Sequence, residues 1–77
     1  MKINKTEAKF IIAMKQQKTP TEVFIQFSER YSRQHIFQNV IRALYFKGAL
    51  EKIMLNKVNV AYKSTPEALK IAKKMLK

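Results

Sequence analysis

The chain has 77 residues, of which 47% are hydrophobic, so it is long enough for one small domain, residues 1–77, with its own core. Sixteen Lys and Arg residues against five acidic residues give a formal net charge of +11. This excess favours a polyanionic partner: nucleic acid, an acidic membrane surface or an acidic protein. The absence of cysteine excludes disulfide bonds and thiolate metal sites.

The first predicted element is a helix over about residues 5–17. Asn4 and Glu7 have the spacing of a capping box, in which each side chain accepts a hydrogen bond from the other residue's backbone N–H. Apolar residues then recur at helical spacing and define the expected buried face: Ala8, Ile11 and Ile12.

A second helix is predicted from Pro20, which suits the first helical position. Thr19 before it is a typical N-cap, and Glu22 completes a second capping box. Its buried side is expected to consist of Val23, Phe24 and Phe27. The helical pattern is interrupted around residues 28–31.

The third helix carries the strongest helical signal. Ser32 is its predicted N-cap, and Gly48 is its predicted end, because glycine readily adopts the left-handed conformation that closes a helix. One side is a continuous apolar stripe: Ile36, Phe37, Val40, Ile41 and Leu44. The other side is polar: Gln34, His35, Gln38, Asn39 and Arg42.

After Gly48 the apolar period changes to two, which predicts a β-hairpin with strands at residues 50–55 and 58–63. Asn56 and Lys57 mark the turn, and because they lack the glycine that tight hairpins favour, a longer loop is an alternative. Residues 64–67 repeat the helix-start signal. The last helix is expected to turn these residues inward: Ala68, Leu69, Ala72, Met75 and Leu76. It is expected to expose Lys70, Lys73, Lys74 and Lys77.

The predicted fold is mainly α with a β-hairpin (α+β), in the order helix-helix-helix-strand-strand-helix. Residues 44–52, Leu-Tyr-Phe-Lys-Gly-Ala-Leu-Glu-Lys, are similar to the segment that joins the recognition helix to the wing in bacterial regulators of the MarR and PadR type. Residues 64–68, Ser-Thr-Pro-Glu-Ala, are similar to the step that follows their wing. The chain therefore resembles a winged helix-turn-helix domain over roughly residues 6–76.

Two features depart from that family's pattern. Phe27 and Tyr31 stand where the family usually has a small residue and a glycine. The family's long dimerising helices are also absent from this sequence, so the sequence leaves open whether the chain forms a homodimer.

The resemblance implies that the third helix enters the major groove of double-stranded DNA and that the hairpin, as the wing, contacts the backbone. Amide side chains suit adenine and arginine suits guanine, so the base-reading candidates are Gln34, His35, Gln38, Asn39 and Arg42. The candidates for backbone contact are Ser32, Arg33, Lys52, Lys57 and Lys63. The alternatives are a solvated polar helix face, a surface or phosphate contact for His35, and a hairpin edge guarded by lysine. Tyr45 and Tyr62 are expected in the core.

The sequence does not indicate an enzyme. Three of the five acidic residues are already assigned to helix starts: Glu7, Glu22 and Glu67. Nothing in the pattern pairs Glu29 with Glu51, and the sole glycine, Gly48, excludes a glycine-rich phosphate loop. The single histidine has no partner for a metal site, so no cofactor, metal or small-molecule ligand is expected.

The sequence thus predicts a small repressor-like transcription regulator, cytoplasmic and associated with the nucleoid, that binds double-stranded DNA specifically or semi-specifically. One alternative is an adaptor for an acidic protein of the transcription machinery, which exposed aromatic side chains at Tyr45 and Phe46 would favour. Others are a non-specific DNA-coating protein and, last, a membrane-surface protein that binds through its basic final helix. The longest apolar run, residues 10–14, is too short to span a membrane. The Lys-, Ile-, Asn- and Phe-rich composition is typical of A+T-rich genomes, such as those of many phages and low-GC bacteria.

Overall fold

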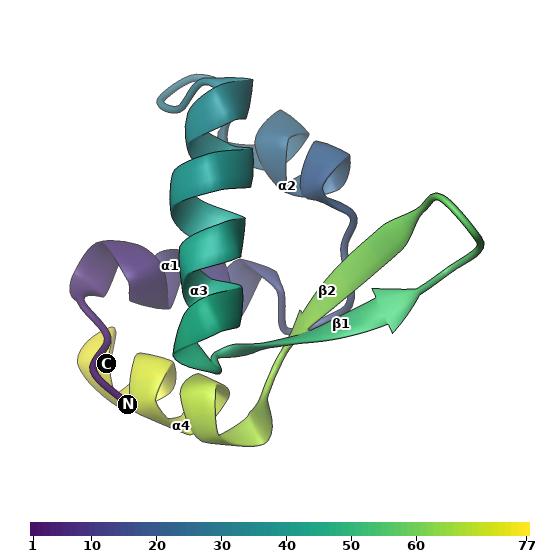
Figure 1. Cartoon of the computed structure of the whole chain (residues 1–77). Helices are drawn as coiled ribbons and strands as arrows, with labels where there is room; N and C mark the ends of the chain where they lie inside the picture. Colours follow the sequence, from purple (N-terminus) through teal and green to yellow (C-terminus); the bar gives the residue numbers. More distant parts are fainter.

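The order of elements along the chain agrees with the predicted α+β order (Figure 1). The computed structural model describes all of residues 1–77 and contains two helices, a long third helix in two parts, an antiparallel hairpin and a final helix. The elements are α1 (Lys5–Ala13), α2 (Pro20–Phe27), η1 (His35–Ile41), α3 (Arg42–Lys47), β1 (Leu50–Met54), β2 (Val60–Ser64) and α4 (Pro66–Met75). In Figure 1 the third helix stands at the centre, with the hairpin projecting away from it.

The third helix is continuous over residues 33–47, but its central part, η1, is π-helical. In a π-helix the backbone hydrogen bonds join residues five apart, so Ile36 and Ile41 lie on the same side, and both are buried. The sequence pattern predicted an α-helix throughout, which is wrong for this part. Val40 and Leu44 complete the buried stripe, whereas Phe37 is only half-buried.

The predicted capping boxes are confirmed. The Asn4 side chain accepts a hydrogen bond from the Glu7 N–H at 2.8 Å, and Glu7 accepts one from the Asn4 N–H at 3.0 Å. Thr19 and Glu22 make the same reciprocal pair at the start of α2, at 3.2 and 2.9 Å. Because each box satisfies two N–H groups that a helix start leaves free, both helices begin where the sequence predicts.

The ends of the third helix also follow the sequence. The Ser32 hydroxyl accepts a hydrogen bond from the His35 N–H at 3.1 Å, as an N-cap does. Gly48 has φ 88° and ψ 13°, and the Ala49 N–H donates to the Leu44 carbonyl at 2.9 Å. This is the left-handed closure that the glycine predicted.

The hairpin turn is the longer alternative, a five-residue loop over residues 55–59. The Asn56 side-chain oxygen accepts hydrogen bonds from the Val58 N–H at 3.0 Å and the Asn59 N–H at 2.9 Å, which replaces the tight glycine turn. The strands pair in the register Leu50 with Ser64. Val58, predicted in the second strand, lies in the loop and is 85% exposed.

The backbone between α1 and α2 lies beside β2. Lys18 and Tyr62 exchange backbone hydrogen bonds of 3.0 and 2.8 Å, and the Ser64 N–H donates to the Met14 carbonyl at 3.0 Å. The buried Ser64 hydroxyl donates to the Ile11 carbonyl at 2.6 Å. Helix α1 therefore ends at Ala13 and not near residue 17, because the chain leaves the helix to run along this strand.

A core of 14 buried residues draws on all four helical regions and on β1. Helix α4 packs on α1 and contributes two small buried side chains, Ala68 and Ala72. Leu69 and Met75 are partly buried against the core as predicted, but Leu76 is 40% exposed at the end of α4, so its predicted inward position is wrong.

Replacing Leu44 with Ala is expected to lower the free energy of unfolding by about 2–4 kcal/mol, because the fully buried side chain leaves a cavity in a small core. Thermal and urea melts measure the loss. Phe46→Ala, two residues along the same helix but 73% exposed, is the matched control and should change stability by at most about 0.5 kcal/mol. Equal losses in the two variants would contradict the observed orientation of the helix.

Candidate nucleic-acid interface

The third helix presents a polar face to solvent. Gln34, Gln38, Asn39 and Arg42 are all exposed, while the apolar stripe of the same helix holds it to the core. No acidic residue occurs between residues 33 and 47, so nothing on this helix offsets the charges of its basic side chains. The face therefore combines hydrogen-bonding groups with positive charge.

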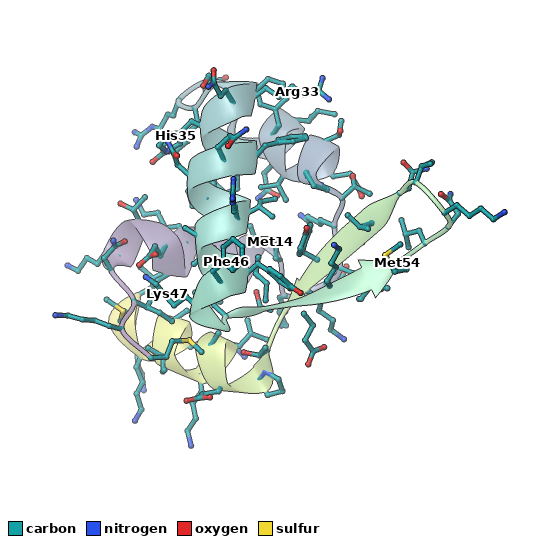
Figure 2. The ribbon with its side chains drawn as sticks, in the orientation of Figure 1. Met14, Arg33, His35, Phe46, Lys47 and Met54 are labelled. Carbon is teal, nitrogen blue, oxygen red and sulfur yellow. The ribbon has the colours of Figure 1, made fainter.

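His35 is half-buried at one side of this face. Its ring stacks on Tyr31, with centroids 5.1 Å apart and planes 14° apart, and its Nδ1 lies 3.2 Å from the Asn39 side-chain nitrogen. Figure 2 shows His35 and Arg33 on opposite sides of the helix. His35 thus orients Asn39, whose carbonyl oxygen and second N–H stay available to a ligand.

The turn before the third helix is held by aromatic side chains. Phe10 of α1 lies 4.4 Å from Phe27 and 5.3 Å from Tyr31, measured between ring centroids. Phe27 and Tyr31 are partly buried and pack on the core from the turn. Their packing fixes the direction in which the third helix leaves α2.

Two arginines lie over phenylalanine rings one turn further along the helix. The Arg33 guanidinium is 5.0 Å from the Phe37 ring centroid, and that of Arg42 is 5.6 Å from the Phe46 ring centroid. Such cation–π contacts restrict a long side chain while leaving the guanidinium N–H groups free. The two pairs have the same spacing and lie nine residues apart.

The three hairpin lysines proposed for backbone contact do not share one face. Lys52 pairs across the strands with Tyr62, and Lys63 pairs with Glu51. Because side chains alternate along a strand, Lys52 and Lys63 lie on opposite faces of the hairpin. Lys57 is exposed in the loop, beside the exposed apolar side chains of Leu55 and Val58, which the sequence patterns did not indicate as surface.

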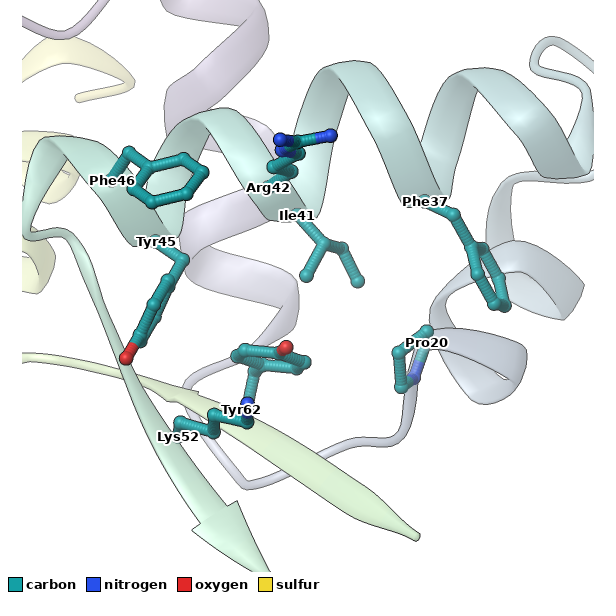
Figure 3. Close-up of a pocket in the computed structure, with 8 residues that line it drawn as sticks. All are labelled: Pro20, Phe37, Ile41, Arg42, Tyr45, Phe46, Lys52 and Tyr62. Carbon is teal, nitrogen blue, oxygen red and sulfur yellow. The ribbon is translucent and has the colours of Figure 1, made fainter. Parts of the chain in front are cut away.

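A groove of about 320 Å³ lies between the third helix and the hairpin (Figure 3). Phe37, Ile41, Tyr45 and Tyr62 form its apolar lining, with Arg42 and Lys52 among the residues around it. Tyr45 touches Tyr62 edge to face, with centroids 5.9 Å apart. Tyr62 is half-buried against the core, but Tyr45 is 40% exposed, so its predicted core position is wrong.

The Glu7 carboxylate lies 2.6 Å from the Lys47 ammonium and so joins α1 to the end of α3. Partial burial acts to raise the pKa of Glu7, but hydrogen bonds from Lys47 and from the Asn4 N–H outweigh it and lower the pKa below its ordinary value of 4.5. Hydrogen bonds from the Thr19 backbone and hydroxyl likewise lower the pKa of Glu22.

No three His, Cys, Asp or Glu side chains come together as a metal site would require, and none of the helices is both long and apolar enough to cross a membrane. Comparison of the chain with known protein families, with curated proteins and with solved structures finds no match.

The variant Glu7→Gln is expected to melt at a lower temperature than the unmodified protein at neutral pH. A carboxylate with a lowered pKa contributes stability above its ordinary pKa and loses it as the pH falls through the folded-state value, here below 4.5. The difference in melting temperature should therefore shrink on acidification below pH 4.5. Glu51→Gln, on the exposed hairpin, is the control. A Glu7→Gln difference that is independent of pH would show that the charge of Glu7 is not involved.

Proposed function

We propose that this protein binds double-stranded DNA as a small repressor-like transcription regulator of the winged-helix kind, with the third helix in the major groove. The observation that carries the proposal is the face of that helix: exposed amide and guanidinium side chains, no acidic residue, and a separate stripe that anchors it to the core. Such a face can enter a groove without disturbing the fold.

The proposed division of roles follows the chemistry of the side chains. Gln34, Gln38 and Asn39 present the donor and acceptor pair that matches adenine, and Arg42 presents the fork that matches guanine. His35 supports Asn39 at the edge of this surface. At the start of the helix, Ser32 and Arg33 lie where phosphate would meet the helix N-terminus.

The hairpin is proposed to contact the DNA backbone as a wing. Lys52 lies on the side of the hairpin that faces the third helix, and Lys57 extends from the loop. Lys63 lies on the other face, opposite Glu51, so we assign it a smaller contribution than these two. Binding as a homodimer would require two half-sites about one helical turn apart, which footprinting would reveal.

Affinity for duplex DNA is expected to fall steeply with salt, because each phosphate contact releases a condensed counterion. Roughly five to eight such contacts give a slope of log K against log salt of about −4 to −7. Fluorescence anisotropy with a labelled duplex at several salt concentrations measures the slope. Affinity that does not change between low and physiological salt would overturn the proposed function.

Gln38→Ala and Arg42→Ala are expected to lower the affinity for a selected operator by about 1–3 kcal/mol and to affect a scrambled duplex far less. Both side chains are exposed, so the fold should be retained, as circular dichroism can check. Lys57→Ala should weaken binding to both duplexes alike and reduce the salt slope by about one unit, because it contacts phosphate only.

Competition between the operator and the scrambled duplex distinguishes sequence reading from simple adhesion. If Gln38→Ala and Arg42→Ala lower the affinity for both duplexes by the same factor, the third helix does not read bases. That result would support a protein that coats DNA without sequence preference.

A further inference from the structure

The groove between the third helix and the hairpin extends beyond the part drawn in Figure 3. A second hollow of about 290 Å³ adjoins it and shares Pro20 and Phe37 with it. This second hollow reaches Arg33 at the start of the helix and Val58 in the hairpin loop. Together the two form one depression along the third helix, from Phe46 to Arg33.

The apolar character of this depression is not explained by the core or by DNA binding. Phe46 is 73% exposed and Tyr45 is 40% exposed, although the same helix buries Ile36, Val40, Ile41 and Leu44 on its other side. Phosphate and base-edge contacts are made by polar groups and do not require this surface. Adjoining exposed aromatic side chains that border a hollow are typical of a site that binds another protein.

The charge around the depression restricts what can occupy it. Arg33, Arg42 and Lys52 are among its lining residues, and no acidic side chain is. A basic or neutral segment would leave these cations without partners in a chain that already carries a net charge of +11. We infer that the groove is a docking site for an acidic amphipathic helix of a partner protein.

The residues of the groove match both faces of such a helix. Apolar side chains at positions i, i+3 or i+4, and i+7 would pack on Phe37, Tyr45 and Phe46. Carboxylates beside them would meet the guanidinium groups of Arg33 and Arg42, which are held over phenylalanine rings at 5.0 and 5.6 Å. A guanidinium that is already restricted loses less freedom when it binds a carboxylate in its planar fork.

The docking site shares Arg33, Arg42 and Lys52 with the proposed DNA interface, so one occupant would exclude the other. An acidic partner would then act as a competitor of DNA. The docking itself does not depend on the proposed function, since it is measured without DNA.

The direct test uses the full chain and a fluorescein-labelled synthetic helical peptide with leucines at i, i+4 and i+7 and glutamates beside them. In one control peptide lysines replace the glutamates, and in the other serines replace the leucines. Anisotropy should show saturable binding of the acidic leucine peptide. Each control peptide should bind at least about tenfold more weakly, because each lacks one of the two matching features.

Variants locate the site. Phe46→Ala and Arg42→Glu should each weaken binding of the acidic leucine peptide by at least about fivefold. The matched controls lie outside the groove: Ile25→Ala, which removes another exposed apolar side chain, and Lys70→Glu, which reverses another exposed charge. These should change the affinity by less than about twofold. Circular dichroism verifies that all four variants fold.

Four results would overturn the inference. The serine peptide could bind as tightly as the leucine peptide, the control variants could lose as much affinity as the groove variants, or no peptide could saturate the protein. Self-association in light scattering that Phe46→Ala abolishes would also overturn it, because a second copy would then occupy the groove. Peptide binding without any binding of duplex DNA would retain this inference and reject the proposed function.

Discussion

The hydrogen bond from the Ser64 hydroxyl to the Ile11 carbonyl determines where the hairpin sits. The carbonyls in the last turn of a helix have no partner within the helix, and at the end of α1 this buried serine supplies one. The adjoining backbone pair between Lys18 and Tyr62 continues the attachment along β2. The hairpin is therefore fixed to α1, and its distance from the third helix, which defines the groove, is fixed with it.

The third helix has three sides, and each lies in a different environment. Its buried side holds the core through Ile36, Ile41 and Leu44, its polar side is free for a ligand, and its third side lines the groove. The helix can combine these three sides because contacts with the rest of the chain hold both of its ends. The aromatic cluster around Phe10 holds the turn before it, while Gly48 and the Glu7–Lys47 ion pair hold its last turn. With both ends fixed, the helix needs only a narrow apolar stripe, and the rest of its surface is free to bind.

The features that the sequence predicted well are local ones. The caps at Asn4 and Thr19 and the closure at Gly48 involve residues within five positions of one another, so their spacing determines them. The Ser64–Ile11 hydrogen bond joins residues 53 positions apart, so no periodicity of the sequence indicates it. The pairing of Lys18 with Tyr62 is also long-range and was missed for the same reason. The π-helical turn was also missed, because the apolar stripe fits either helix type. Within the candidate site, the exposure of the polar helix face followed from periodicity. The separation of Lys63 from Lys52 depends on the register of the two strands, which the five-residue loop sets, because a two-residue turn at Asn56 and Lys57 would place both lysines on one face.

The positive charge of this protein is not neutralised from within. Three of the five carboxylates lie in the first turns of helices, two of them hydrogen-bonded in capping boxes, and Glu7–Lys47 is the one ion pair between side chains. The remaining cations therefore favour any polyanion, and charge alone does not select between DNA and an acidic protein. The shape and the apolar surface of each proposed binding site distinguish between these two ligands. Gln38 and Arg42 suit the edge of a base pair. The exposed ring of Phe46 contributes favourable binding free energy only where an apolar side chain of the ligand covers it. Arg42 belongs to both surfaces, which is why the two proposed ligands would compete.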